Sequence, residues 1–304
     1  TDLGETQAVK DAGFAIEEGD FFGIVGESGS GKSVTTKSIL RLGPSNCRIM
    51  GGEILFQGED ILKKSEAELR EIRGGEIAMI FQDSLSALNP VYTVGNKMVE
   101  LIRRHTSMTK KEAKARVLEL LTAVGITDPE KAMRSYPHEL SGGMRQRVMI
   151  AMAMSSNPKV LIADEPTTAL DVTIQAQILH LLLELQKKNN MSIILITHDL
   201  GVVAQTCKRV AVMCGGYVVE EGTVEEIFLN PGHPYNQAMI ASMPRVGGTF
   251  EQFLERDLSD GSGNLCPFLN RCKYADKTCE ACLPKYYESS EEHKILCHRR
   301  EEEK

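Results

Sequence analysis

Residues 26–33 read G-E-S-G-S-G-K-S, which matches the phosphate-binding pattern G-x-x-x-x-G-K-[ST]. The glycines let successive backbone N–H groups turn inward around an anion, and a following helix adds the partial positive charge of its N-terminus. Lys32 can then reach the β- and γ-phosphates, and the Ser33 hydroxyl can ligate Mg²⁺. We therefore predict a nucleotide site made of Gly26, Glu27, Ser28, Gly29, Ser30, Gly31, Lys32, Ser33 and Val34.

Two carboxylates, Asp164 and Glu165, directly follow the apolar stretch 160–163. The carboxyl end of a strand is where open α/β sheets bind ligands, so both side chains are expected beside the nucleotide. Asp164 can hold Mg²⁺ through water, and Glu165 can polarise the attacking water as a general base. Taken alone, such a pair could equally be a strand that simply meets solvent at its end.

Apolar strand patterns alternate with helical patterns, which predicts an α/β domain with a largely parallel sheet. We expect a helix that begins at the capping box of Thr109 and Glu112 and ends at Gly125, and an insertion of helices over about 83–144. The expected strands cover 13–16, 21–25, 53–56, 77–81, 160–163 and 192–196, with a hairpin of 209–213 and 217–220. Further helices are expected over 32–42, 142–154 and 172–188.

The composition is that of an ordinary globular chain of 304 residues, with 42% hydrophobic and 25% charged residues, and favours about two domains. A net charge of −7 gives no overall basic footprint, so we predict no nucleic-acid partner. No apolar run approaches the ~20 residues of a membrane span. The polar first residues show no signal peptide, which favours the cytosol.

Residues 140–146, L-S-G-G-M-R-Q, closely resemble the signature motif of ABC transporter ATPases, with Met144 at the position where glutamine is usual. The resemblance implies that Ser141, Gly142, Gly143 and Gln146 contact ATP held by a partner subunit. The family also stacks adenine on an aromatic residue upstream of the first strands. Phe14 is the first aromatic residue here and comes too late, so we expect the stacking residue to precede residue 1.

Other landmarks of that family follow in its order. Gln82 matches the Q-loop glutamine, Ala169-Leu170-Asp171 the D-loop at the dimer interface, and His198 the switch histidine. The implied catalytic residues are Gln82, Glu165 and His198. The implied Mg²⁺ contacts are Ser33, Gln82 and Asp164.

Narrower marks resemble the oligopeptide/dipeptide importers: residues 164–177, His233-Pro-Tyr235, and C-P-F-x-x-R-C over 266–272. The resemblance implies a RecA-like parallel core, an antiparallel β subdomain and a helical insertion within an ATPase domain at 1–225, and an extension at 226–304. It also implies a related second ATPase subunit, two permease subunits, an external binding protein, and a place on the cytoplasmic face of the membrane. Peptides are the family's default substrate; nickel, glutathione, oligosaccharides and, more distantly, a soluble ABC ATPase remain alternatives.

Five of the eight cysteines crowd the C-terminal part. Four thiolates can hold a [4Fe–4S] cluster or a tetrahedral Zn²⁺. The family resemblance implies a C-terminal cysteine motif that can carry such a cluster and, by position, the ligands Cys266, Cys272, Cys279 and Cys297. Cys282 is then spare, although Cys282 or His298 could substitute as the fourth ligand. Zinc and free or disulfide-bonded cysteines are the alternatives.

Overall fold

The computed structural model describes residues 5–44, 46–82, 87–168, 170–243, 265–290 and 292–301. Asp83, where the predicted insertion begins, and Ala169 of the D-loop motif lie outside these ranges.

The main sheet has eight strands within the described ranges, in the order β4–β5–β6–β1–β7–β8–β10–β9. Neighbours from β4 to β7 run parallel, and those from β7 to β9 run antiparallel. The predicted α/β class with a parallel core is therefore confirmed. The strands are β1 Phe21–Val25, β4 Ile77–Ile80, β5 Val160–Asp164, β6 Ser192–Thr197, β7 Arg209–Cys214, β8 Tyr217–Thr223, β9 Tyr286–Ser290 and β10 His293–Leu296.

The prediction of an N-terminal strand at 13–16 is wrong. This segment is irregular, and its alternation arises because Phe14 and Ile16 pack against the core from an extended chain. Phe14 stacks on Phe22 with ring centroids 5.4 Å apart. The strand expected at 53–56 shrinks to β2 (Leu55–Phe56), which pairs with β3 (Glu59–Asp60) in a separate two-stranded sheet.

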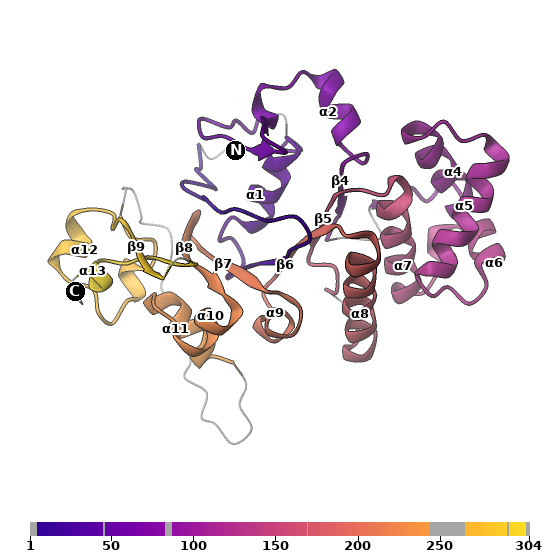
Figure 1. The fold of residues 1–304 in the computed structure, drawn as a ribbon. Coiled ribbons are helices and arrows are strands. Elements are labelled where there is room, and N and C mark those ends of the chain that lie inside the picture. The colour runs from indigo at the N-terminus through magenta and orange to yellow at the C-terminus, as the bar shows by residue number, and fades with distance from the viewer. Residues whose placement is uncertain are drawn as a thin grey trace.

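Helices flank the sheet (Figure 1). The predicted helices over 32–42, 142–154 and 172–188 correspond to α1, α7 and α8; α1 ends early, and Arg41 just beyond it has a left-handed φ of +50°. The capping box of Thr109 and Glu112 does begin α5, as predicted. The helices are α1 Lys32–Ile39, α2 Glu66–Ile72, α4 Val94–His105, α5 Lys110–Ala123, α6 Pro129–Arg134, α7 Gly142–Ala153, α8 Val172–Asn189, α9 Leu200–Thr206, α10 Val224–Leu229, α11 Pro234–Ala241, α12 Lys277–Ala281 and α13 His298–Glu301.

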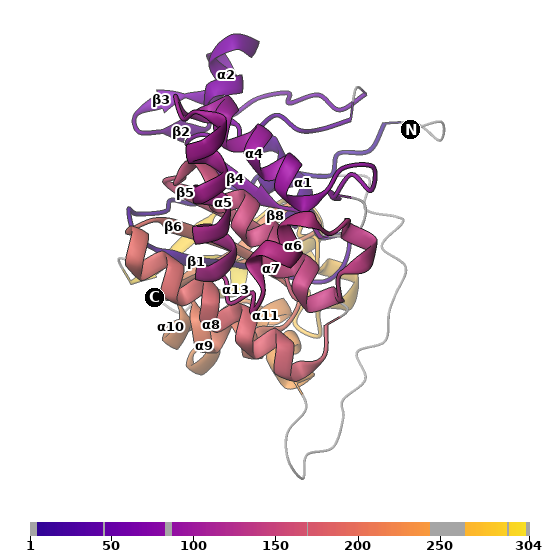
Figure 2. The same cartoon turned by 90° about the vertical axis from the view of Figure 1, so that its right-hand side faces the viewer.

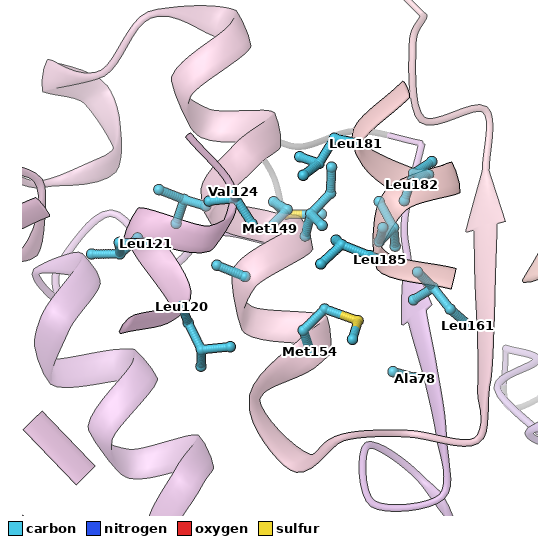
Figure 3. Packing of buried hydrophobic residues seen from close by; sticks show 14 of the residues in the cluster. Ala78, Leu120, Leu121, Val124, Met149, Met154, Leu161, Leu181, Leu182 and Leu185 are labelled. Atoms are coloured by element: carbon cyan, nitrogen blue, oxygen red, sulfur yellow. The ribbon is translucent and has the colours of Figure 1, made fainter. Parts of the chain in front are cut away.

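The parallel strands are buried on both faces, and alternate residues enter different cores. Leu161 and Leu195 belong to one core, whereas Ile162 and Ile194 belong to the other. Figure 3 shows part of the first core, to which α5, α7 and α8 contribute side chains together with Ala78 of β4 and Leu161 of β5. Figure 2 views the molecule from the side of helices α4–α7, which lie in front of the sheet. Because residues of these helices belong to the same core as residues of the parallel strands, the helices are anchored to the sheet.

The C-terminal residues add to the same sheet. Strand β10 pairs antiparallel with β8 and carries β9 at the outer edge, so the sheet runs from the helices α4–α7 at one end to α12 and α13 at the other (Figure 1). Phe268 and Leu296 pack in a third core with Val25 and Val212. None of the described helices is both long and apolar enough to cross a membrane.

Candidate nucleotide-binding site

The predicted phosphate loop connects β1 to α1 and lies tightly against its neighbours. Gly26 and Gly31 have φ values of +150° and +104°, which favour glycine. A Cβ on Gly26 would lie 2.2 Å from the Met213 carbonyl oxygen, and one on Gly31 would lie 2.7 Å from that of Ala8. Gly31 is the N-cap of α1, so the free N–H groups of the first turn face the loop. The glycines are required both by conformation and by space.

Lys32 is folded into this loop. Its Nζ donates to the carbonyl oxygens of Gly26 and Glu27, at 2.7 and 2.8 Å, and the residue is 5% exposed. Burial lowers the pKa of Lys32, while the carboxylates of Glu165, Asp164 and Glu27 act in the opposite direction. The ammonium group is thus held at the loop, where it can meet a phosphate.

Ser33 and Asp164 come together across the sheet, as a shared Mg²⁺ site requires. The Ser33 hydroxyl donates to Asp164 Oδ1 at 2.8 Å, and Asp164 is 1% exposed. Burial raises the pKa of Asp164, against the lowering effect of the Ser33 hydrogen bond. Its Oδ2 is buried and has no hydrogen-bond partner among the described residues. Hydroxyl and carboxylate oxygens are ligands that Mg²⁺ prefers, so this pair fits the ion, which would neutralise phosphate charge.

The three predicted catalytic residues lie together, with Gln82 and His198 both next to the Glu165 carboxylate. That carboxylate accepts hydrogen bonds from Gln82 Nε2 and from the Thr168 hydroxyl, both at 2.9 Å, and lies 3.4 Å from His198 Nδ1. The backbone at Glu165 has a φ of +46°, a strained value for a residue other than glycine. Thr168 was missed from the sequence, where its position three residues after Glu165 in the same turn was the available signal.

The signature residues lie at the start of α7. Ser141 is exposed, and its hydroxyl caps the helix by accepting from the Met144 N–H. Gly143 lies close to Ile174 of α8: a Cβ there would be 3.0 Å from Ile174 Cγ2. Gln146 differs from its neighbours, because it is 4% exposed and its side chain therefore lies within the molecule. Asp171 caps α8 through the Ile174 N–H, at 2.9 Å.

The four predicted cysteine ligands line one cavity. Cys266, Cys272, Cys279 and Cys297 surround it together with His233, His298 and Arg299, whereas Cys282 does not line it. Burial raises the pKa of Cys266 to about 11, and the other three thiols add to this effect. No three His, Cys, Asp or Glu side chains in the described ranges are placed to hold a single metal ion.

Comparison with known proteins supports the assignment of a nucleotide-binding ATPase site. The family described as "ABC transporter" matches residues 9–168, and "Oligopeptide/dipeptide transporter, C-terminal region" matches residues 219–279. The ATP-binding cassette MJ0796, in a dimeric post-hydrolysis state bound to ADP and phosphate, is 30% identical, with a TM-score of 0.64 over 71% of this chain and 90% of that one. Fold and site together define an ABC-type ATPase, which couples ATP hydrolysis to transport.

Two relatives narrow the family. The oligopeptide transport ATP-binding protein OppD of Bacillus subtilis is 55% identical over 83% of this chain and 70% of that protein. The dipeptide transport ATP-binding protein DppD of Escherichia coli is 46% identical over 96% of this chain and 90% of that protein. The chain therefore belongs to the ATP-binding subunits of the oligopeptide/dipeptide ABC transporter family.

Proposed function

We propose that the chain powers the import of peptides, by hydrolysing ATP at a site that it completes with a related, non-identical ATPase subunit. The names of the relatives, oligopeptide and dipeptide transport proteins, support the substrate class. In this proposal two permease subunits and an external binding protein complete the importer, and the chain is attached to the cytoplasmic face of the membrane. ATP closes the two ATPase subunits on each other, and hydrolysis opens them.

The observation that carries the ATPase part is the convergence of Gln82, Glu165 and His198 beside Lys32, Ser33 and Asp164. In the described part of the chain, no hydrogen bond or ion pair joins the signature residues 141–143 to the phosphate loop. Ser141 is instead exposed, which leaves it accessible to ATP on a second subunit. We assign ATP binding to residues 26–34, signature contacts to Ser141, Gly142 and Gly143, and the dimer interface to Asp171. Gln146, predicted together with the signature residues, is left out because its side chain is buried.

We also propose that the ATPase domain covers residues 1–225, with the helical insertion at about 83–144, and that 226–304 is a cysteine-containing extension. The extension is built onto the ATPase sheet through β10. We assign Cys266, Cys272, Cys279 and Cys297 as ligands of a [4Fe–4S] cluster, which would give the extension a structural or redox-sensing role. Thiolates are the ligands of such clusters.

Three features of the cavity fit a cluster. Four cysteines line the cavity, which is the number of thiolates that a [4Fe–4S] cluster takes, one for each iron. His233 is 1% exposed, and its Nδ1 accepts from the Tyr235 N–H, which leaves the proton on Nε2. That Nε2 has no partner among the described residues and can donate to a sulfur. Arg299 supplies a cation to an anionic cluster.

The substrate is tested by uptake in bacterial cells that lack the native gene for this chain. Complementation with the wild-type chain is expected to restore uptake of labelled di- and oligopeptides, and complementation with Glu165→Gln is not. Labelled Ni²⁺, glutathione and an oligosaccharide are tried in parallel. Restored uptake of one of these alone would replace the peptide assignment, and no transport phenotype would favour a soluble ATPase.

Metal content tests the cluster in protein purified without oxygen. We expect about four irons and four labile sulfides per chain, with broad absorption near ~400 nm. Cys266→Ser should lose this content, whereas Cys282→Ser, the matched control outside the cavity, should keep it. One zinc and no iron, or iron content unchanged by Cys266→Ser, would contradict the assignment.

A further inference from the structure

Two residues of the C-terminal part hold Glu27, the second residue of the phosphate loop. Arg271 donates from Nη1 and Nη2 to the two carboxylate oxygens of Glu27, at 2.6 and 2.7 Å. The Glu27 backbone N–H donates to the Tyr235 hydroxyl at 2.8 Å. The loop is therefore held by contacts that span more than two hundred residues of sequence.

These contacts are built into the core. Tyr235 is 1% exposed and meets Phe268 edge to face, with ring centroids 5.4 Å apart. The guanidinium of Arg271 lies 5.3 Å from the centroid of Phe268, and the Arg271 side chain is 9% exposed. A bidentate pair between a largely enclosed arginine and a carboxylate has a better-defined geometry than most surface ion pairs. Phe268 thus positions both residues that reach the loop.

The same contacts control charge and orientation at the loop. The Glu27 side chain is 43% exposed and lies one residue from Gly26, where a phosphate would be bound. A carboxylate there repels an anionic ligand unless a cation neutralises it. Because Tyr235 occupies the Glu27 N–H, the loop backbone is ordered before a ligand arrives, and a pre-ordered loop binds more tightly.

We propose that Arg271 and Tyr235 are positioning residues of the ATP site: Arg271 neutralises and orients the Glu27 carboxylate, and Tyr235 fixes the loop backbone. Arg271 also lies in the turn between Cys266 and Cys272, which is closed by hydrogen bonds from the Leu269 N–H to the Cys266 carbonyl and from the Cys272 N–H to the Leu269 carbonyl. The same hydrogen-bonded turn therefore contributes two cysteines to the cavity and an arginine to the phosphate loop. This inference needs only the ATPase activity, and holds whichever solute is transported.

The first test measures the Kd of Mg·ATP for the purified full chain by calorimetry. Arg271→Met is expected to weaken binding about five- to tenfold in the wild-type background, and less than about twofold when Glu27→Gln is also present. Tyr235→Phe, which keeps the packing on Phe268, is expected to weaken binding about threefold. The control is Arg209→Met, which removes a comparable arginine–carboxylate pair to Glu221, 2.7 Å long and away from the loop.

The second readout separates positioning from mere structural support. In the assembled importer the KM for ATP should rise in both variants, while kcat at saturating ATP stays within about twofold. Lower melting temperatures with unchanged Kd would reduce both residues to structural support and overturn the proposal. An equal loss from Arg271→Met with and without Glu27→Gln would also overturn it, because Arg271 would then not act through Glu27. If Arg271→Met fails to fold, Arg271→Lys takes its place, because lysine keeps the charge but cannot reproduce the bidentate contact with Glu27, and Tyr235→Phe tests the backbone contact separately.

Discussion

The two ends of the main sheet place functional side chains in different ways. At the parallel end, β4, β5, β6 and β1 all stop at the same edge, and the residues that follow them meet there: Gln82, Glu165, His198 and the phosphate loop. At the antiparallel end, Tyr235 comes from a helix, His293 from a strand and Arg271 from a short turn. Tyr235 and Arg271 are joined by their packing on Phe268, and His293 is held by Glu220.

The difference shows which arrangements follow from topology and which depend on packing. Parallel strands bring their carboxyl ends to one edge whatever their side chains, so polar residues at those ends converge. Antiparallel strands alternate in direction and create no such edge. The contacts on Glu27 and Glu220 exist only because buried aromatic and charged groups find partners across the fold.

The largest expected effect is a loss of turnover caused by a substitution at the parallel end. Glu165→Gln removes the proposed general base, so turnover should fall about 10³-fold while ATP still binds. It is measured as steady-state ATP hydrolysis in the importer, with the partner subunit's own site inactivated. Glu184→Gln, an exposed carboxylate on α8, is the control and should leave turnover unchanged. Full activity of Glu165→Gln would show that another group activates the water.

The next largest expected effect is a loss of stability caused by a substitution at the antiparallel end. His293 lies 2.8 Å from Glu220 Oε1, and Glu220 is 0% exposed and also accepts from the N–H groups of Gly232 and His233. Removing one partner of a buried pair is costly, so His293→Ala should lower the free energy of unfolding by about 3 kcal/mol, as measured in urea.

The matched control for that experiment is His180→Ala. His180 pairs with Glu184 on an exposed helix face, with 74% of its side chain accessible. Its loss should change stability by less than about 0.5 kcal/mol. Equal effects of the two substitutions would mean that the antiparallel end contributes little to stability, and a separate early transition in His293→Ala would mean that this end unfolds on its own.

The smallest expected effect is a pH-dependent difference in stability between the wild-type chain and a variant at Asp164, at the parallel end. Burial raises the pKa of Asp164 above its ordinary value of 3.8, so the folded metal-free chain binds that proton more tightly than the unfolded chain does. Wild-type stability should therefore fall relative to Asp164→Asn as the pH rises from the unfolded pKa through the folded one. The measurement is urea unfolding of the two chains without Mg²⁺ at several pH values, and the expected result is a stability difference that shifts against the wild-type chain as the pH rises. A difference that is constant with pH would contradict the burial argument.

Much of the nucleotide site was predictable because its residues are close in sequence or stand at strand ends. The phosphate loop, Asp164 and Glu165 are recognisable from spacing alone, and the structure brings Ser33 to Asp164 and Gln82 to Glu165. Strand 13–16 was mispredicted because an extended segment packed on the core has the same alternation as a strand. Gln146 was predicted as a contact to ATP on a partner subunit from its place in the motif. That place in the sequence does not reveal that its side chain is buried.

The sequence by itself determined the class of the fold, the phosphate loop and the polar residues at its strand ends, because period, glycine spacing and strand termini are local properties. It marked Tyr235 and Arg271 as family features but assigned them no role. Only the tertiary structure decided that both contact Glu27 and that β9 and β10 extend the ATPase sheet. Such long-range contacts depend on how buried surfaces fit together, and no local pattern in the chain encodes that fit.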